Sequence, residues 1–155
     1  FVPHPSKSIF EPTQIIECLS FLLNTISITV SLTPKKCEKI LAKCQQFLRY
    51  EAVSIRDVAS LIGTLVSTFP GVDYGPLHYR TLERDKDMAL KSANGIFDAV
   101  MYLSSGSKLD LHWWVSSLPT ACRVINRGFP TCVITTDASG IGWGASMGEV
   151  TTRGL

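Results

Sequence analysis

The stretch from Thr131 to Met147 has the sequence Thr-Cys-Val-Ile-Thr-Thr-Asp-Ala-Ser-Gly-Ile-Gly-Trp-Gly-Ala-Ser-Met. Its first six residues are β-branched and apolar enough for a strand covered on both faces, and this strand ends at Asp137. Residues 138–142 predict a turn, after which residues 143–147 can return as a second strand. The stretch therefore predicts a C-terminal β-hairpin with a carboxylate at the end of its first strand.

Asp137 is the candidate metal ligand of this sequence. A carboxylate at the end of a buried strand is costly to keep ionised unless cations or hydrogen-bond donors compensate its charge, and carboxylate oxygens bind divalent cations. The small residues that follow would let a polyanionic backbone approach closely. The alternative is structural, because an aspartate commonly caps a strand end or a turn.

A second hairpin is predicted near the N-terminus. The run from Cys18 to Leu23 is apolar, and residues 26–32 alternate between apolar and hydroxyl side chains. A period of two with β-branched residues is typical of a half-buried strand. Asn24 and Thr25 separate the two runs, so we expect an antiparallel pair connected at this point.

Two amphipathic helices follow. Thr33 and Pro34 have the residue types of a helix N-cap and first helical position, and a capping-box pattern at Ser54 opens the second helix, which Pro70 ends. Three small residues lie four apart on one side of the second helix and predict that another element packs closely there: Ala59, Gly63 and Ser67.

Two further helices are predicted at about residues 82–91 and from a second capping-box spacing, Ser107 with Asp110, to Pro119. Together with the hairpins they give an α+β fold. Its parts are an N-terminal β-hairpin, a helical middle and a C-terminal hairpin that lacks the sheet it should join. The unpaired edges of that hairpin predict poor solubility.

The first helix carries a local excess of positive charge. Four lysines occupy much of the surface outside its apolar stripe, namely Lys35, Lys36, Lys39 and Lys43, and only Glu38 offsets them. Such a face can contact phosphates, or it can serve only as a solvated face of the helix. A second basic and aromatic cluster, with His78 and Arg80 as candidate nucleic-acid ligands, follows in a turn-rich segment whose aromatic residues can equally be packing of the loop itself.

The composition excludes several classes of protein. With 155 residues, 45% hydrophobic and 18% charged, the chain is neither disordered nor a large multidomain protein. Its net charge of +2 gives no argument for a nucleic-acid or membrane partner, so such an argument must rest on local patches.

The cysteines and the apolar segments predict the compartment. Five cysteines without metal-ligand spacing disfavour a disulfide scaffold or a zinc site and favour a reducing, intracellular compartment. No secretory signal pattern opens the chain, which we expect to be a fragment of a longer, non-secreted polypeptide. Residues 15–32 are interrupted by Glu17, Asn24 and several hydroxyls, so we expect no membrane span.

The string from Thr135 to Ala145 resembles the opening hairpin of the ribonuclease H domain attached to retroelement reverse transcriptases. In that family an Asp-Ala-Ser strand end supplies the first catalytic carboxylate. Leu19-Ser20-Phe21 resembles the primer grip, where the family usually has Leu-Gly-Phe. Further motifs resemble the reverse transcriptases of DIRS-type, tyrosine-recombinase retrotransposons and their relatives: Lys7-Ser8, Pro12-Thr13-Gln14, residues 32–36, 60–63, 76–80, 97–99 and 111–114.

The resemblance implies four segments. These are the end of the palm with the primer-grip hairpin (1–33), the helical thumb (34–70), the connection (71–130) and the start of a ribonuclease H-like domain (131–155). It also implies a polyprotein that copies RNA into DNA and degrades the RNA strand with Mg²⁺, so its partners would be an RNA/DNA hybrid or primer–template duplex and the rest of the polyprotein.

Within that enzyme, Asp137 would be a catalytic residue and a Mg²⁺ ligand, residues 19–21 would position the primer end, and the lysine helix would lie along the duplex. We expect the isolated chain to be inactive, because the polymerase aspartates would precede Phe1 and the other nuclease carboxylates would follow Leu155. Two alternatives remain open: the hairpin of an actin-like or hexokinase-like ATPase, and a non-functional transposon remnant.

Overall fold

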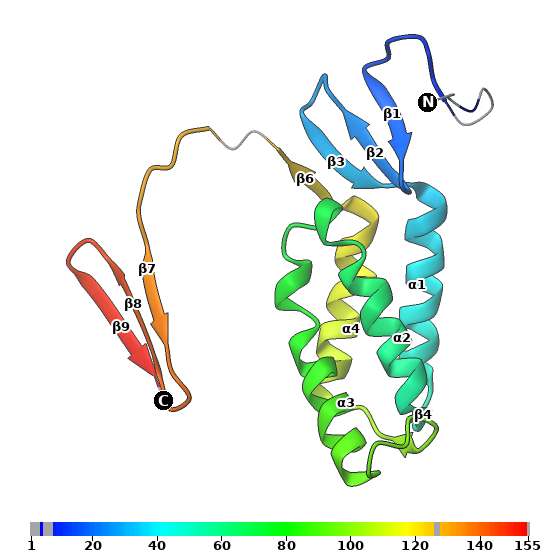
Figure 1. Ribbon diagram of the computed structural model, residues 1–155, viewed down its shortest axis with the longest axis vertical. Helices are drawn as coiled ribbons and strands as arrows, with labels where there is room; N and C mark the ends of the chain where they lie inside the picture. The colour runs from blue at the N-terminus through cyan, green and yellow to red at the C-terminus, as the bar shows by residue number, and fades with distance from the viewer. Residues whose placement is uncertain (1–3, 5–7, 126–127, 155) are drawn as a thin grey trace. The chain divides into compact units, whose positions relative to one another are not determined.

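The computed structural model describes residues 4, 8–125 and 128–154. The chain divides into two compact units, unit 1 (residues 1–125) and unit 2 (residues 126–155). Among the described residues, unit 1 combines small sheets with four α-helices, and unit 2 is a sheet without helices (Figure 1). The predicted α+β class is confirmed.

Unit 1 contains a four-stranded antiparallel sheet in the order β1-β2-β3-β6. Its strands are β1 (Ile15–Cys18), β2 (Phe21–Asn24), β3 (Thr29–Leu32) and β6 (Cys122–Val124). The predicted hairpin is the β2–β3 pair, in which Phe21 lies opposite Leu32. The sequence prediction missed the two outer strands of this sheet, β1 and β6. A tight turn adds β1 to one side of this pair, and the chain returns after the helices to add β6 to the other.

Four helices make up the rest of unit 1: α1 (Pro34–Arg49), α2 (Ile55–Val66), α3 (Arg80–Ser92) and α4 (Ser105–Ser117). Helix α1 packs on α4 and α2, and α3 packs on α2 and α4, so the four surround one core. A short ribbon of β4 (Val53–Ser54) and β5 (Val100–Met101) joins their far ends. The single-turn helices η2 (Phe69–Gly71), η3 (Gly75–Leu77) and η4 (Leu118–Thr120) complete the unit.

Each helix contributes fully buried side chains to this core. The largest are Ile40 from α1, Ile55, Leu61 and Leu65 from α2, Leu82 from α3, and Leu111 and Trp114 from α4. In α1, α2 and α4 the buried residues recur at helical spacing, so burial of one side of each of these helices holds the bundle together, and α3 adds Leu82.

Two sequence expectations for the helices are wrong. Gly63 is exposed, and nothing lies within 4 Å of the position that a Cβ would take, so no element packs closely on α2 at this glycine. Helix α4 begins three residues earlier than predicted, because the N-cap is Ser104 and its side chain accepts a hydrogen bond from the backbone N–H of Ser107.

Unit 2 is a three-stranded antiparallel sheet of β7 (Thr135–Ala138), β8 (Trp143–Met147) and β9 (Val150–Gly154), in that order. The β7–β8 pair is the predicted hairpin, with Asp137 opposite Gly144, and β9 is an additional strand. The first strand begins at Thr135 and residues 131–138 are exposed, so the expectation of a strand covered on both faces is wrong. Within unit 2 no helix or second layer covers the sheet among residues 128–154.

The described part of the chain contains no helix with the length and apolar run needed to cross a membrane. Residues 15–32 form three short strands instead of a helix.

Candidate nucleic-acid interface

A groove of about 600 Å³ lies where the β1–β2 turn, α1 and α2 meet in unit 1. We call it the lysine groove. It is lined by Glu17, Ser20, Thr33, Lys35, Lys36, Lys39, Ile40, Lys43, Ser60, Thr64 and Ser67. Two groups of residues that the sequence analysis singled out separately, the Ser20 region and the four lysines, therefore share one site.

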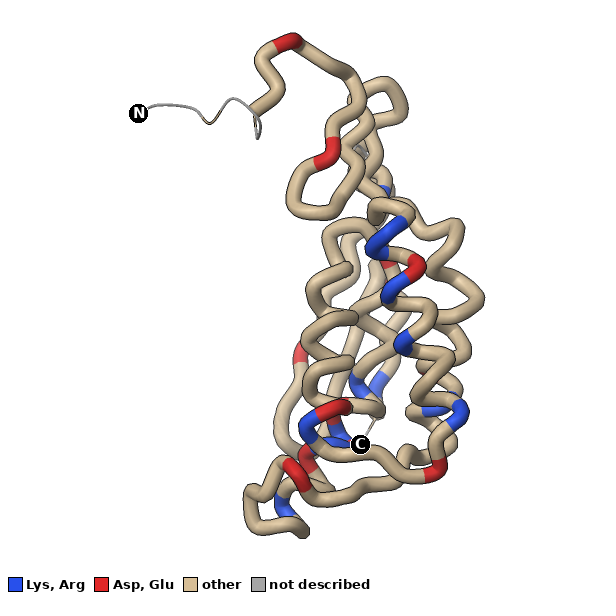
Figure 2. The backbone as a smooth tube through the Cα atoms, turned by 90° about the vertical axis from the view of Figure 1, so that its right-hand side faces the viewer, with Lys and Arg blue, Asp and Glu red and all other residues tan. Residues whose placement is uncertain are grey.

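The lysines face the groove because the opposite side of α1 is fixed in the core. The Thr33 side chain caps the helix by accepting from the backbone N–H of Lys36, and Pro34 occupies the first turn. Ile40, Cys44 and Phe47 are buried, which leaves the basic positions outside the core. Figure 2 shows basic positions recurring along this helix.

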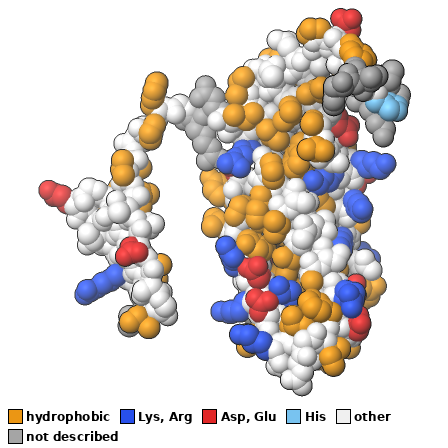
Figure 3. All heavy atoms as spheres, viewed as in Figure 1, with side chains coloured by type: hydrophobic (Ala, Val, Ile, Leu, Met, Phe, Trp, Pro, Cys, Tyr) orange, Lys and Arg blue, Asp and Glu red, His pale blue; other side chains and the backbone are white. Residues whose placement is uncertain are grey.

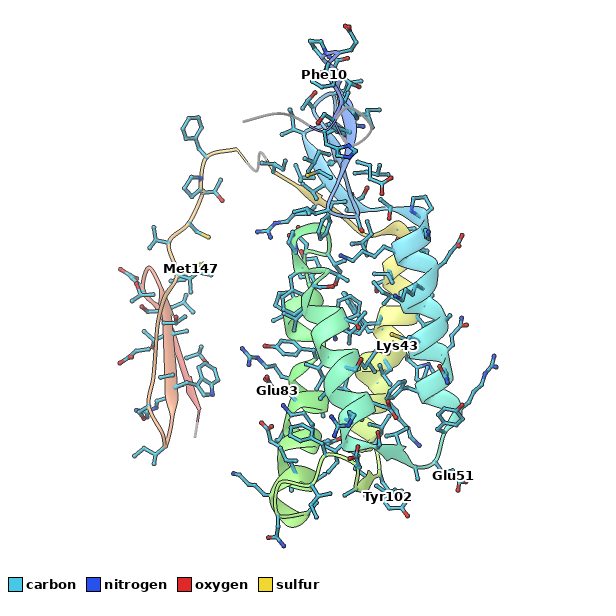
Figure 4. The ribbon with its side chains drawn as sticks, turned by 45° about the vertical axis from the view of Figure 1, so that its right-hand side comes forward. Phe10, Lys43, Glu51, Glu83, Tyr102 and Met147 are labelled. Carbon is cyan, nitrogen blue, oxygen red and sulfur yellow. The ribbon has the colours of Figure 1, made fainter. Side chains whose placement is uncertain are left out.

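Two of the lysines reach across the groove to α2. The Lys43 Nζ donates to Ser60 Oγ at 3.0 Å and to Thr64 Oγ1 at 3.4 Å, and Figure 4 labels this side chain between the two helices. The Lys36 Nζ donates to the carbonyl oxygen of Ser67 at 3.2 Å. That carbonyl belongs to the C-terminal end of α2, where a cation is favoured.

The ammonium group of Lys36 also lies 4.3 Å from the centre of the Phe21 ring. Partial burial in this position lowers the pKa of Lys36 below its usual value, because desolvation disfavours the charged form. Phe21 is half-buried and begins β2, so it connects the hairpin to the basic face of α1.

Within residues 4, 8–125 and 128–154, none of the four lysines forms an ion pair with Asp or Glu. Glu17 lines one end of the groove, but its carboxylate is not within ion-pair distance of these ammonium groups. Several positive charges without an acidic partner give the groove a local excess of positive charge, which attracts anions.

The β1–β2 turn forms the other wall. Leu19 and Ser20 both have positive φ, 50° and 65°, which is the backbone of a two-residue hairpin turn of the primed type. The carbonyl oxygen of Ser20 accepts from the N–H of Thr33 at 3.2 Å, so the turn is bonded to the start of α1. Leu19 is 87% exposed and does not line the groove.

The sequence analysis missed the α2 wall of the groove. Ser60, Thr64 and Ser67 lie at positions i, i+4 and i+7 of one helix face. The spacing of these three hydroxyl residues is visible in the sequence. The small residues next to them, Ala59 and Gly63, led instead to the prediction that another element packs there. A row of hydroxyls opposite a lysine helix could have been recognised only if the two helices were known to be adjacent.

His78 and Arg80 lie outside the lysine groove. The His78 ring stacks on Trp113 with 3.9 Å between ring centroids, and its Nδ1 lies 3.4 Å from Asp110 Oδ1. The Arg80 guanidinium donates to Glu83 at 2.9 Å. Both side chains therefore contact other residues of the protein, as expected if this segment serves its own packing. A role of His78 and Arg80 in binding nucleic acid remains a prediction.

Asp137 lies in unit 2, in a separate hollow of about 690 Å³ with Trp143 and Arg153 among the lining residues. Its Oδ1 accepts from the backbone N–H of Ala138 at 2.9 Å, and the side chain is exposed. Among the described residues no group of three or more His, Cys, Asp or Glu could hold a metal ion. The residues present supply one carboxylate at this hollow and do not fit a two-metal centre.

No protein-family model matches the chain. No curated protein matches it either. Among solved structures, the chain is similar to the foamy viral protease-reverse transcriptase dRH in complex with double-stranded DNA, with a TM-score of 0.50 and 16% sequence identity. The similarity covers 86% of this chain and 21% of that one, so this chain spans about a fifth of the length of its neighbour. At this identity the similarity shows a shared fold.

Proposed function

We propose that this chain is the thumb and connection of a reverse transcriptase with the start of its ribonuclease H domain, and that the lysine groove binds the backbone of a primer–template duplex. The observation that carries the proposal is the convergence of the Ser20 turn and four lysines without acidic partners in one groove. Duplex handling of this kind uses positive charge and shape, with little contact to base edges.

The similarity in fold supports the proposal, since the neighbour is described as a reverse transcriptase in complex with double-stranded DNA. The finer assignment to a DIRS-type element rests on the sequence motifs. In the parent enzyme Asp137 would hold Mg²⁺ only together with carboxylates from other parts of the polyprotein. The isolated chain would bind nucleic acid without cleaving it, in a reducing compartment that suits its free cysteines.

The proposal is tested by measuring the affinity of the full chain for a fluorescent RNA/DNA hybrid by anisotropy, from about 50 to about 200 mM salt. The double variant Lys36→Glu/Lys39→Glu should weaken binding at low salt by about tenfold or more. It should also reduce the slope of log K against log salt by about two, because each phosphate contact contributes about one to that slope.

The matched control is Arg84→Glu/Lys91→Glu on α3, which makes the same change of net charge at exposed positions outside the groove. This control should keep most of the affinity and the original slope. Equal losses in the two double variants would show that binding depends on net charge alone and would contradict the proposed groove.

A further inference from the structure

A second groove, of about 470 Å³, lies between α3 and β5 in unit 1 and shares no residue with the lysine groove. We call it the α3–β5 groove. One stripe of α3 forms its first wall, with Asp85, Met88, Ala89, Ser92 and Ala93 recurring at helical spacing, and residues 100–102 form the second wall.

Large apolar side chains are exposed along this groove. Met88, Val100 and Tyr102 are 62%, 65% and 73% exposed, and Figure 4 labels Tyr102 at the far end of the bundle. Single exposed apolar residues are common on protein surfaces, but a group of them around a hollow is typical of an interaction site.

The outer edge of β5 is free to pair with another strand. Within residues 4, 8–125 and 128–154, β4 is the one strand that pairs with β5. The Ile55 N–H donates to the Ala99 carbonyl at 3.0 Å, and hydrogen bonding alternates along an antiparallel strand. Ala99 and Met101 therefore bond towards β4. The N–H and C=O groups of Val100 and Tyr102 point away from β4 and are available to an added strand.

Asp85 brings a negative charge to the α3 wall. Burial opposes its ionisation, but hydrogen bonds from Ser104 and Ser107 outweigh this and lower the pKa of the carboxyl. Both bonds printed on the carboxylate reach Oδ2, whereas an ionised carboxylate can accept about four. In the described part of the chain Asp85 forms no ion pair. An apolar groove with such a carboxylate in its wall favours a ligand with a basic side chain.

We propose that the α3–β5 groove binds an extended peptide segment of another protein, which adds as a strand to the free edge of β5 and pairs a Lys or Arg side chain with Asp85. From Asp85 to Ala93 the helix extends about 12 Å at 1.5 Å per residue, which is the length of about four strand residues. Main-chain hydrogen bonds to β5 supply affinity, and the carboxylate supplies specificity. This inference is independent of the proposed function, because the two grooves are separate.

The test measures binding of the full wild-type chain to the fluorescent peptide Thr-Val-Thr-Arg-Thr-Val-Thr, with both ends blocked, by anisotropy. The peptide reads the same in both directions, so it suits a parallel or an antiparallel strand, and its Arg and two Val lie on one face. Replacing Arg by Glu should weaken binding about tenfold or more, because the charge-assisted hydrogen bond is lost. N-methylation of alternate peptide amides should weaken it by a similar factor. Equal affinity of the Arg and Glu peptides, or no binding of the Arg peptide at millimolar concentration, would overturn the proposal.

Amide hydrogen exchange locates the peptide on the chain. In the free chain the N–H groups of Val100 and Tyr102 should exchange at least about tenfold faster than that of Met101, and the Arg peptide should slow both. Bound peptide without this protection would contradict the proposed place of binding. Protection that rises with the concentration of the chain alone would show that a second copy occupies the edge, and it would also refute the proposal.

On the protein side, Met88→Arg should weaken binding of the Arg peptide about tenfold, because it places a guanidinium three residues from Asp85 on the same helix face. Met88→Leu should retain the affinity. Leu77→Arg is the matched control, since Leu77 is an exposed apolar residue outside the groove. Equal losses in Met88→Arg and Leu77→Arg would show repulsion by net charge alone and would exclude the α3–β5 groove as the site.

Discussion

Ser20 occupies a backbone conformation that favours glycine. Its φ of 65°, next to Leu19 at 50°, places both residues of the β1–β2 turn in the left-handed region. A non-glycine residue there is strained by roughly 1 kcal/mol or more. The departure from Leu-Gly-Phe that the sequence shows at this position therefore has a physical cost, which the bond from the Thr33 N–H to the Ser20 carbonyl helps to offset.

Replacing Ser20 by glycine should stabilise the protein by about 0.5 kcal/mol, since relief of the left-handed strain exceeds the extra entropy of glycine in the unfolded chain. Thermal unfolding followed by circular dichroism should show a midpoint raised by a few degrees. Ser31→Gly is the control, because Ser31 lies within β3 and glycine weakens a strand interior. A lower midpoint for Ser20→Gly would refute the strain argument.

Two adjacent tryptophans illustrate how far a single residue can be predicted. Adjacent positions on a helix do not face the same side, so only one of the two can face the core. Trp114 is fully buried and donates from Nε1 to the His78 carbonyl at 2.6 Å, whereas Trp113 is partly exposed and stacks on the His78 ring. The burial of one tryptophan followed from the sequence, but the histidine that both of them contact did not.

At the level of secondary-structure elements, the first residue of some helices is fixed by a nearby capping residue. The first residue of others is fixed by contact with another helix. Thr33 and Ser54 cap α1 and α2 as predicted, and each side chain accepts from a backbone N–H three residues later. For α4 the segment 104–107 contains three serines, so several caps were available locally. Asp85 of α3 decides between them by accepting from the Ser104 N–H at 2.9 Å and from Ser107 Oγ at 2.6 Å.

Asp85→Asn should therefore destabilise the protein by about 1–2 kcal/mol at neutral pH. Burial of Asp85 opposes its ionisation, but hydrogen bonds from Ser104 and Ser107 outweigh this and lower the pKa of the carboxyl. A lowered pKa gives stability that is present above the unfolded value of about 3.9 and is lost as the pH falls through the folded value. Urea unfolding of both proteins should show their difference at pH 7 shrinking below about pH 4.

Asp87→Asn on the same helix is the matched control. Asp87 pairs with Lys86 at an exposed position, so its loss should change the unfolding free energy by about 0.3 kcal/mol. If the two variants behave alike, Asp85 does not hold the start of α4.

At the scale of the whole molecule, the two units differ in how they are stabilised. Unit 1 buries large side chains from all four helices. The last strand of its sheet is β6, next to which the Ile125 N–H donates to the Ile28 carbonyl at 2.8 Å. Unit 2 contains no buried residue among residues 128–154 and exposes large apolar side chains: Phe129, Val133, Ile134, Ile141, Trp143, Met147 and Val150 (Figure 3). A sheet of three strands with free edges and exposed apolar residues promotes association.

A chain ending at Ile125 should therefore keep the cooperative thermal unfolding of the full chain and be monodisperse by light scattering, while the full chain associates as its concentration rises. The physical reason is that the truncation removes exposed apolar surface but no residue of the core. A monodisperse full chain, or a truncated chain without a cooperative transition, would contradict the view that unit 1 supplies the stable core and unit 2 the surface that associates.

The amino-acid sequence alone was enough to predict the α+β class, the β2–β3 and β7–β8 hairpins, the caps of α1 and α2, and the basic face of α1. Each of these depends on residues a few positions apart, through periodicity, turn chemistry and capping. Tertiary structure decided that β1 and β6 extend the first sheet, that Asp85 sets the start of α4, and that the Ser20 turn and the α2 hydroxyls meet the lysines in one groove. These features join residues far apart in the chain, and their free energy comes from contacts that exist only once the helices have packed.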